Sequence, residues 1–211
     1  MLLNLEAFRK EPLIRQPFDF VIVRDFLARQ AKQAFDPDFP RISKPGSFPI
    51  SELSYGPTFA RLLAELCGAE FKAAVSEKFA LDLSARPIMV TVRGRCQKSE
   101  GKIHTDTPSK IISVLLYLND RWDHDGGRLR LVRTKDNLES FLVEIPPEWG
   151  VLVAFRRADN SFHGHKPFEG ERRVIQVNWV SDQRVADREL RRHRRSARIK
   201  RFLPFAWSIG Y

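Results

Sequence analysis

The sequence predicts a mainly β protein whose strands fold as a double-stranded β-helix, a jelly-roll barrel, with flanking helices. The first observation is a series of strand-like runs that starts at Ile88 and recurs over short links to Val180, giving eight strands. The second is that no long helical pattern interrupts the chain between Gly101 and Val180. That number and spacing of strands are typical of two sheets folded as a jelly roll.

Residues 1–86 are predicted to support the barrel from outside. A helix should begin near Pro57 and end at Gly68, because a proline suits the first turn and a glycine the end. The apolar positions of this helix and the next fall at helical spacing, namely Phe59, Leu62, Leu63 and Leu66, then Phe71, Val75 and Phe79. Before them we expect a short helix or loose arm over 1–16, a strand over 18–23, a helix from Asp25 to about Phe35, and a connecting loop over 36–50.

Residues 87–181 are predicted to form the β core, and residues 182–211 a basic C-terminal helix and tail, all within one structural domain. Asp182 can cap the helix, which should run to about Ile199. The expected core strands lie near 88–92, 111–118, 128–133, 141–145, 151–155, 163–167 and 173–180, and the count of eight leaves His104-x-Asp106 at a strand end, after a polar loop over 94–101.

The charge of the chain is concentrated in one segment. The formal net charge is +10, and residues 184–201 contain nine Lys or Arg against two acids, Asp187 and Glu189. Two cysteines give no disulfide framework, and no apolar run approaches the roughly 18 residues that span a bilayer. The first residues lack the pattern of a signal peptide, so we expect a cytoplasmic protein without a membrane segment.

His104 and Asp106 are the first candidates for a metal site. Side chains at i and i+2 of a strand point to the same side, so this pair aims an imidazole and a carboxylate into one cavity. Two imidazoles and one carboxylate on one face of an ion leave its other positions open for reactants. His163 can supply the second imidazole from a later strand, and His165, two residues on, is the alternative ligand.

An arginine on the last strand is the candidate anchor for a carboxylate, because a guanidinium pairs with a carboxylate through two charge-assisted hydrogen bonds. Arg172 and Arg173 are adjacent and must face opposite ways. If Arg173 points into the barrel, so do the apolar Ile175, Val177 and Trp179, and this alternation favours Arg173. Both arginines remain candidates.

The segment from Gly101 to Val180 resembles the catalytic barrel of the Fe(II)/2-oxoglutarate-dependent oxygenases, especially the prolyl-4-hydroxylase-like branch, which is cupin-like in fold. The matching residues, in the family's order, are His104-Thr105-Asp106, Leu116-Tyr117-Leu118-Asn119, Trp122, Gly126-Gly127-Arg128-Leu129, Pro147 to Gly150, Phe155, His163 with Pro167, Gly170 with Arg172-Arg173, and Trp179.

The resemblance implies a dioxygenase that hydroxylates a protein side chain, such as prolyl, or a small molecule, and that releases succinate and CO₂. It implies Fe(II) held by His104, Asp106 and His163, with 2-oxoglutarate and O₂ as cosubstrates and ascorbate as an accessory reductant. The proline four residues after the iron histidine favours His163, and the Gly-x-Arg spacing favours Arg172. Tyr117 would share the cosubstrate carboxylate, and Arg93 stands where the prolyl type often has a tyrosine, which implies a second carboxylate contact or an anionic substrate.

Two other functions compete with hydroxylation of a protein or small molecule. The arginines of residues 184–201 could neutralise phosphates, which would suit a nucleic-acid demethylase of the same superfamily. That segment has no interleaved aromatic residues for base stacking, so nucleic acid is the less favoured partner. The third function is a non-catalytic, metal-binding jelly roll that uses the basic helix to dock a partner.

Overall fold

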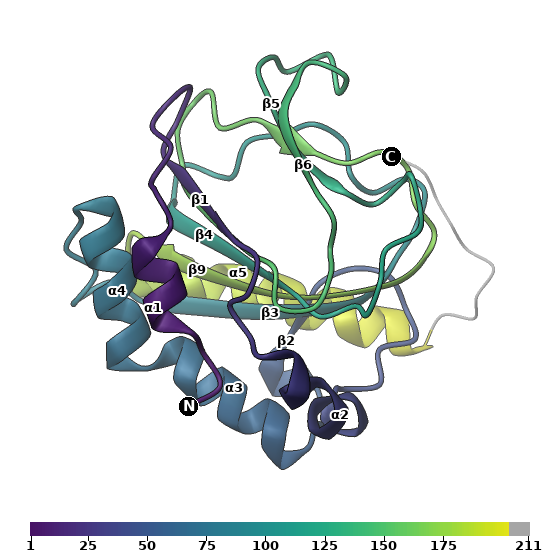
Figure 1. The fold of residues 1–211 in the computed structure, drawn as a ribbon. Coiled ribbons are helices and arrows are strands. Elements are labelled where there is room, and N and C mark those ends of the chain that lie inside the picture. The colour runs from purple at the N-terminus through teal and green to yellow at the C-terminus, as the bar shows by residue number, and fades with distance from the viewer. Residues whose placement is uncertain (203–211) are drawn as a thin grey trace.

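Two antiparallel sheets face each other in the computed structural model, which describes the backbone of residues 1–202 and the side chains of residues 1–197. The larger sheet has the strand order β1-β7-β4-β9-β3-β2 and the smaller sheet the order β6-β5-β8. The larger sheet crosses the middle of the molecule, and β5 and β6 lie opposite it (Figure 1). This two-sheet, mainly antiparallel architecture is the jelly roll that the strand pattern predicted.

The strand bounds follow the predicted runs closely. The larger sheet consists of β1 (Phe20–Val23), β2 (Phe48–Pro49), β3 (Ile88–Cys96), β4 (Lys110–Tyr117), β7 (Leu152–Arg156) and β9 (Gly170–Val180). The smaller sheet consists of β5 (Leu129–Val132), β6 (Phe141–Ile145) and β8 (His163–Gly164).

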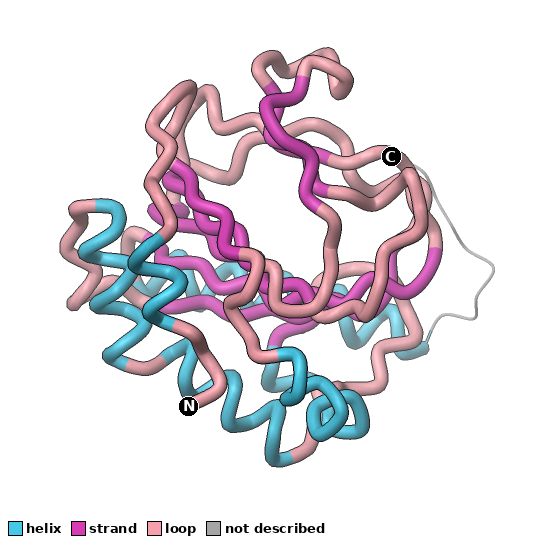
Figure 2. The backbone as a smooth tube through the Cα atoms, viewed as in Figure 1, coloured by secondary structure: helices cyan, strands magenta, loops and turns pink. Residues whose placement is uncertain are grey.

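Helices cover one face of the larger sheet, as Figure 2 shows by colour. They are α1 (Leu5–Lys10), α3 (Pro57–Cys67) and α4 (Ala69–Phe79), and the short η1 (Arg29–Ala31), α2 (Lys32–Phe35), η2 (Asp36–Asp38) and η3 (Ile50–Glu52) lie in the connections. The last helix, α5 (Gln183–Phe202), follows β9 directly. No helix in the described part of the chain is both long enough and apolar enough to cross a membrane.

The larger sheet is buried on both faces, so the protein has two apolar cores. On the helix side, Val114 of β4 and Val177 and Trp179 of β9 pack with the aromatic rings of α1 and α4. Between the two sheets, Tyr117 and Val174 pack with residues of β5, β6 and β7. Because side chains alternate along a strand, β4 and β9 each supply one set of residues to each core.

Three expectations for the chain path were wrong. The helix predicted from Asp25 begins only at Arg29, because Phe26 and Leu27 are buried and their backbone is bonded to distant segments. The Phe26 amide donates to Gly150, and Leu27 bridges to Leu3. The predicted loop over 36–50 contains η2 and β2.

The third error concerns the strand count. Seven strands, β3 to β9, lie between Ile88 and Val180, and His104 contributes a single bridge to His163 instead of an eighth strand. The two helices predicted around Phe59 and Phe71 and the helix capped by Asp182 are present. The part of the predicted tail after Phe202 lies outside the described residues.

Phe71 is the residue that ties the helical layer to the larger sheet. Its fully buried ring lies 5.7 Å from the ring of Phe8, 5.5 Å from that of Phe26 and 6.0 Å from that of Trp179, measured between centroids. We expect Phe71→Ala to lower the free energy of unfolding by about 3–5 kcal/mol, because the substitution would leave a cavity among the rings of Phe8, Phe26 and Trp179. Urea denaturation measures this, and Ile14→Ala, at an exposed side chain, should cost less than about 1 kcal/mol. Equal losses in the two variants would contradict the assignment of this core.

Candidate metal centre

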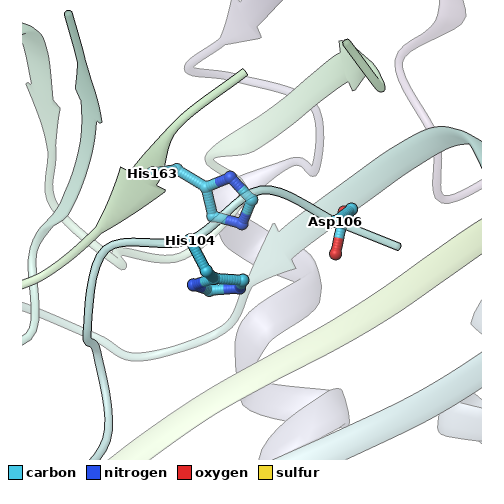
Figure 3. A group of neighbouring side chains, drawn as sticks. All are labelled: His104, Asp106 and His163. Atoms are coloured by element: carbon cyan, nitrogen blue, oxygen red, sulfur yellow. The ribbon is translucent and has the colours of Figure 1, made fainter. Parts of the chain in front are cut away.

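His104, Asp106 and His163 lie together at one end of the space between the sheets. One ligand atom from each lies within 4.8 Å of the others. Figure 3 shows His163 on its strand, with His104 and Asp106 on the segment that passes beside it. Two backbone hydrogen bonds join these pieces: the His104 amide donates to the His163 carbonyl at 3.0 Å, and the reverse bond is 2.9 Å. The side chains therefore converge because these hydrogen bonds join the loop before β4 to β8.

Both histidines present Nε2 to the shared space. The Nδ1 of His163 lies 3.0 Å from the Ser161 carbonyl, and the Nδ1 of His104 lies 2.9 Å from the Lys102 carbonyl. A carbonyl only accepts hydrogen bonds, so each Nδ1 carries the proton and Nε2 keeps its lone pair. Burial lowers the pKa of His163 to about 4, so this imidazole is neutral at physiological pH, as a metal ligand must be.

The Asp106 carboxylate is ionised and held from both sides. Lys110 donates to Oδ1 at 2.6 Å, and the Ser113 hydroxyl donates to Oδ2. Burial alone would raise the pKa of Asp106, but the charge of Lys110 and these hydrogen bonds outweigh it, so the pKa lies below its ordinary value. Hydrogen bonds of this kind orient a carboxylate toward a metal.

His165 and the three-residue group line one cavity, but His165 is not part of that group. Its Nδ1 meets the Lys166 carbonyl at 2.8 Å, and its Nε2 lies 3.9 Å from the Cys96 sulfur. Burial, followed by the charge of Arg172, lowers the pKa of His165 to about 4. The ring is therefore a neutral part of the cavity wall.

A cavity of about 480 Å³ opens beside this group and has Arg172 in its lining. The Arg172 side chain is 6% exposed, its Nε donates to the Gly127 carbonyl at 2.8 Å, and a terminal nitrogen lies 3.5 Å from the Tyr117 hydroxyl. Among the described residues, no carboxylate pairs with it at ion-pair distance. A buried charge without a counter-ion is costly, so this site is suited to an anionic ligand.

Tyr117 and Arg93 complete this side of the cavity. Tyr117 is fully buried, its ring lies 5.3 Å from the Arg172 guanidinium, and burial raises the pKa of its hydroxyl, which therefore remains protonated. Arg93 also lines the cavity, but it pairs with Glu100 at 2.8 Å and donates to Ser47 at 2.9 Å. Arg172 is thus the guanidinium that an anion would meet without displacing a carboxylate.

Arg173 faces the opposite side of β9, so the alternation argument that favoured it was wrong. It pairs with Asp36 at 3.1 Å and with Glu171 at 2.9 Å, and its guanidinium lies 4.9 Å from the ring of Phe39. The argument failed because it assumed that the apolar face of β9 lines the barrel. That face packs under the helices, while Val174, Gln176 and Asn178 share the cavity with Arg172.

Several residues in or behind the cavity wall escaped the sequence analysis. Lys110 and Ser113 hold Asp106, and Ser113 could have been found as a polar residue within an otherwise apolar strand. Glu189, Arg192 and His193 of α5 also line the cavity. They share one helical face at i, i+3 and i+4, but no local pattern shows where that face docks.

Comparisons with known proteins agree with the resemblance stated from the sequence. Residues 92–181 match the family model described as the 2OG-Fe(II) oxygenase superfamily. A prolyl-4-hydroxylase from Pseudomonas putida superposes with a TM-score of 0.54 at 16% identity, over 85% of this chain and 97% of that one. A prolyl 4-hydroxylase from Phytophthora capsici gives a TM-score of 0.50 at 18% identity, over 77% of this chain and 58% of that one.

No curated protein matches the chain. At these identities the two structures support the jelly-roll fold, and the family model supports the oxygenase assignment of residues 92–181.

Gly101 is required where the loop before His104 passes His165. Its φ is +91°, and a Cβ there would lie 2.4 Å from the buried imidazole. We expect Gly101→Ala to lower the free energy of unfolding by about 2–4 kcal/mol, from backbone strain and overpacking together. Chemical denaturation measures this loss. Gly170→Ala is the matched control, because φ is +148° but the nearest atoms belong to the half-buried Phe168 ring, which can move. A loss no greater than in that control would show that the close approach is unimportant.

Proposed function

We propose that this chain, which carries a 2OG-Fe(II) oxygenase domain over residues 92–181, hydroxylates its substrate at an iron held by His104, Asp106 and His163. The observation that carries the proposal is that the three-residue group and the unpaired, buried Arg172 share one cavity. A metal with open positions and an anchor for a carboxylate are the two requirements of a 2-oxoglutarate-dependent reaction.

The donor set fits Fe(II). Two imidazoles and one ionised carboxylate match the 2-His-1-carboxylate arrangement that leaves open positions on the metal. With 2-oxoglutarate and O₂ bound, the iron supplies the oxidising power that inserts an oxygen atom into a C–H bond while succinate and CO₂ are released. The role of the protein is to hold these groups: the Ser161 and Lys102 carbonyls fix the two imidazoles, and Ser113 fixes the carboxylate.

Arg172 is the proposed anchor for the far carboxylate of 2-oxoglutarate. A charge-assisted hydrogen bond in a buried site is stronger than the same bond in water, and this guanidinium is already oriented by the Gly127 carbonyl. The protonated Tyr117 hydroxyl supplies a further donor to the same carboxylate. Arg93 lines the same cavity, and its charge is already paired with Glu100, so we assign it a secondary role in binding 2-oxoglutarate.

The substrate is a protein side chain or a small molecule. Prolyl residues are one candidate because the two superposed structures are named as prolyl 4-hydroxylases, although a shared fold does not fix a substrate. We place the protein in a reducing compartment such as the cytoplasm, where Cys67 and Cys96 would remain the free thiols seen in the structure.

Formation of succinate tests the proposed reaction and the third ligand together. The protein is purified anaerobically, and Fe(II), 2-oxoglutarate and O₂ are then added. We expect Fe(II)-dependent succinate that falls to background in His104→Ala and His163→Ala, because two protein ligands hold the metal poorly. His165→Ala should keep the metal, since His165 lies outside the three-residue group.

Metal content, measured by mass spectrometry after dialysis against Fe(II) or Mn(II), separates loss of binding from loss of turnover. Loss of the metal in His165→Ala together with retention in His163→Ala would overturn the ligand assignment. Absence of Fe(II)-dependent succinate from the wild-type protein, across peptide and metabolite panels, would overturn the proposed reaction.

Substitution of the two neighbouring arginines tests the anchor. Arg172→Met removes the charge but retains an unbranched stem, and we expect the KM for 2-oxoglutarate to rise by at least about tenfold, since a hydrogen bond between charged groups contributes about 1.5–3 kcal/mol. Arg173→Met is the matched control one residue away, on the opposite face, and should change that KM less than about twofold. The reverse order of effects would identify Arg173 as the anchor.

A further inference from the structure

The helix α5 forms one wall of the cavity that holds the candidate metal centre. Asp182 caps it through a hydrogen bond from the Val185 amide at 3.0 Å, so the helix starts immediately after β9. Glu189, Arg192 and His193 then line the same cavity as His104 and Asp106. The helix α5 lies outside residues 92–181, the part of the chain that matches the oxygenase family, so that family match does not account for this wall of the cavity.

Asn178 supplies an unused hydrogen-bond donor on this side of the cavity. Its side chain is buried, and its Nδ2 has no partner in the part of the chain that the structure describes. Gln176 donates to the Asn178 Oδ1 at 3.2 Å, which fixes the orientation of the amide and leaves Nδ2 as the free donor. A buried donor without an acceptor costs free energy, so a ligand oxygen at this position would be favourable.

Lys110 supplies a second donor, with a positive charge. Its side chain is only 16% exposed, and within the described chain Asp106 is its one ion-pair partner. If Asp106 shares its negative charge with a metal ion, Lys110 keeps only part of its counter-ion. An anion beside Lys110 would then restore the balance.

The rim near α5 is also positive. Arg192 lies 2.8 Å from Glu189, but the same carboxylate lies 3.8 Å from Arg188, so two guanidiniums share one negative charge. Burial, and then the charge of Arg192, lowers the pKa of His193, which leaves this imidazole neutral rather than cationic. Over the whole cavity lining, five Lys or Arg side chains face three acids.

We propose that the substrate of this enzyme presents an anionic, oxygen-rich group, a carboxylate or a phosphate, to Lys110, Asn178 and Arg192. This inference rests on the proposed function, because it assigns the substrate side of the same cavity. Arg172 is reserved for the cosubstrate, and the α5 side offers a half-buried ammonium, a buried amide donor and a guanidinium at the rim. A cationic substrate would meet like charges there, and a neutral apolar one would leave Asn178 without an acceptor.

Binding of simple anions tests the proposal without turnover. The full chain is loaded with Zn(II) and saturating 2-oxoglutarate, so that Arg172 is engaged, and inorganic phosphate or acetate is titrated at constant ionic strength. The dissociation constant follows from the rise of the unfolding midpoint with anion concentration. Arg192→Gln, at a side chain that is 69% exposed and can be replaced without disturbing the core, and Lys110→Met remove the proposed charges. Arg191→Gln is the matched control, because Arg191 is exposed on the same helix and does not line the cavity.

We expect anion binding to weaken about tenfold in Lys110→Met and in Arg192→Gln, and to change less than twofold in Arg191→Gln. Tighter binding of phosphate than of acetate would indicate a phosphorylated substrate, and the opposite order a carboxylate. Equal binding by wild type and both variants, or no binding by the wild type, would overturn the proposal. Because Zn(II) replaces iron here, this failure is distinguishable from failure of the proposed reaction, which would appear as absence of Fe(II)-dependent succinate.

Discussion

The pair of backbone hydrogen bonds between His104 and His163 is the constraint on which the site depends. It joins a loop to β8, a strand of two residues, and so brings together residues that are far apart in the sequence. The bonds use main-chain groups, so the side chains remain free to act as ligands. Gly101 and Gly164 permit this junction, because a Cβ at either position would meet the His165 ring or the Gly101 carbonyl. The convergence of the three candidate ligands is therefore a consequence of how the loop before β4 is joined to the smaller sheet.

Much of the fold could be predicted from the sequence, because its signals are local. The β-branched runs of β3, β4 and β9 and the helical spacing around Phe59 and Phe71 depend on residues that are near each other in the chain. The His104-x-Asp106 pair could be found for the same reason, since two residues on one extended segment share a side. The three side chains that the spacing suggested do lie within reach of one another.

The parts that could not be predicted depend on which layer packs where. Alternation along β9 shows that Arg172 and Arg173 point to opposite faces. Because β9 is buried on both faces, alternation does not show which face lines the cavity. The choice required knowledge that the apolar face lies under α4. In the same way, Asp25 is a residue type that caps helices, but Phe26 and Leu27 are buried in the core and their backbone bonds to distant segments instead of forming a helix. The docking of α5 onto the cavity is a long-range contact with no local signature.

The opposite directions of Arg172 and Arg173 have a mechanical consequence. One guanidinium lies between the sheets, and the other is clamped by Asp36 of η2 on the outer layer. These two adjacent residues thus connect β9 to the layers on both of its faces. A rotation of β9 about its own axis would break contacts of Arg172 and of Arg173 at once, so contacts outside the cavity help to keep the Arg172 guanidinium in its orientation.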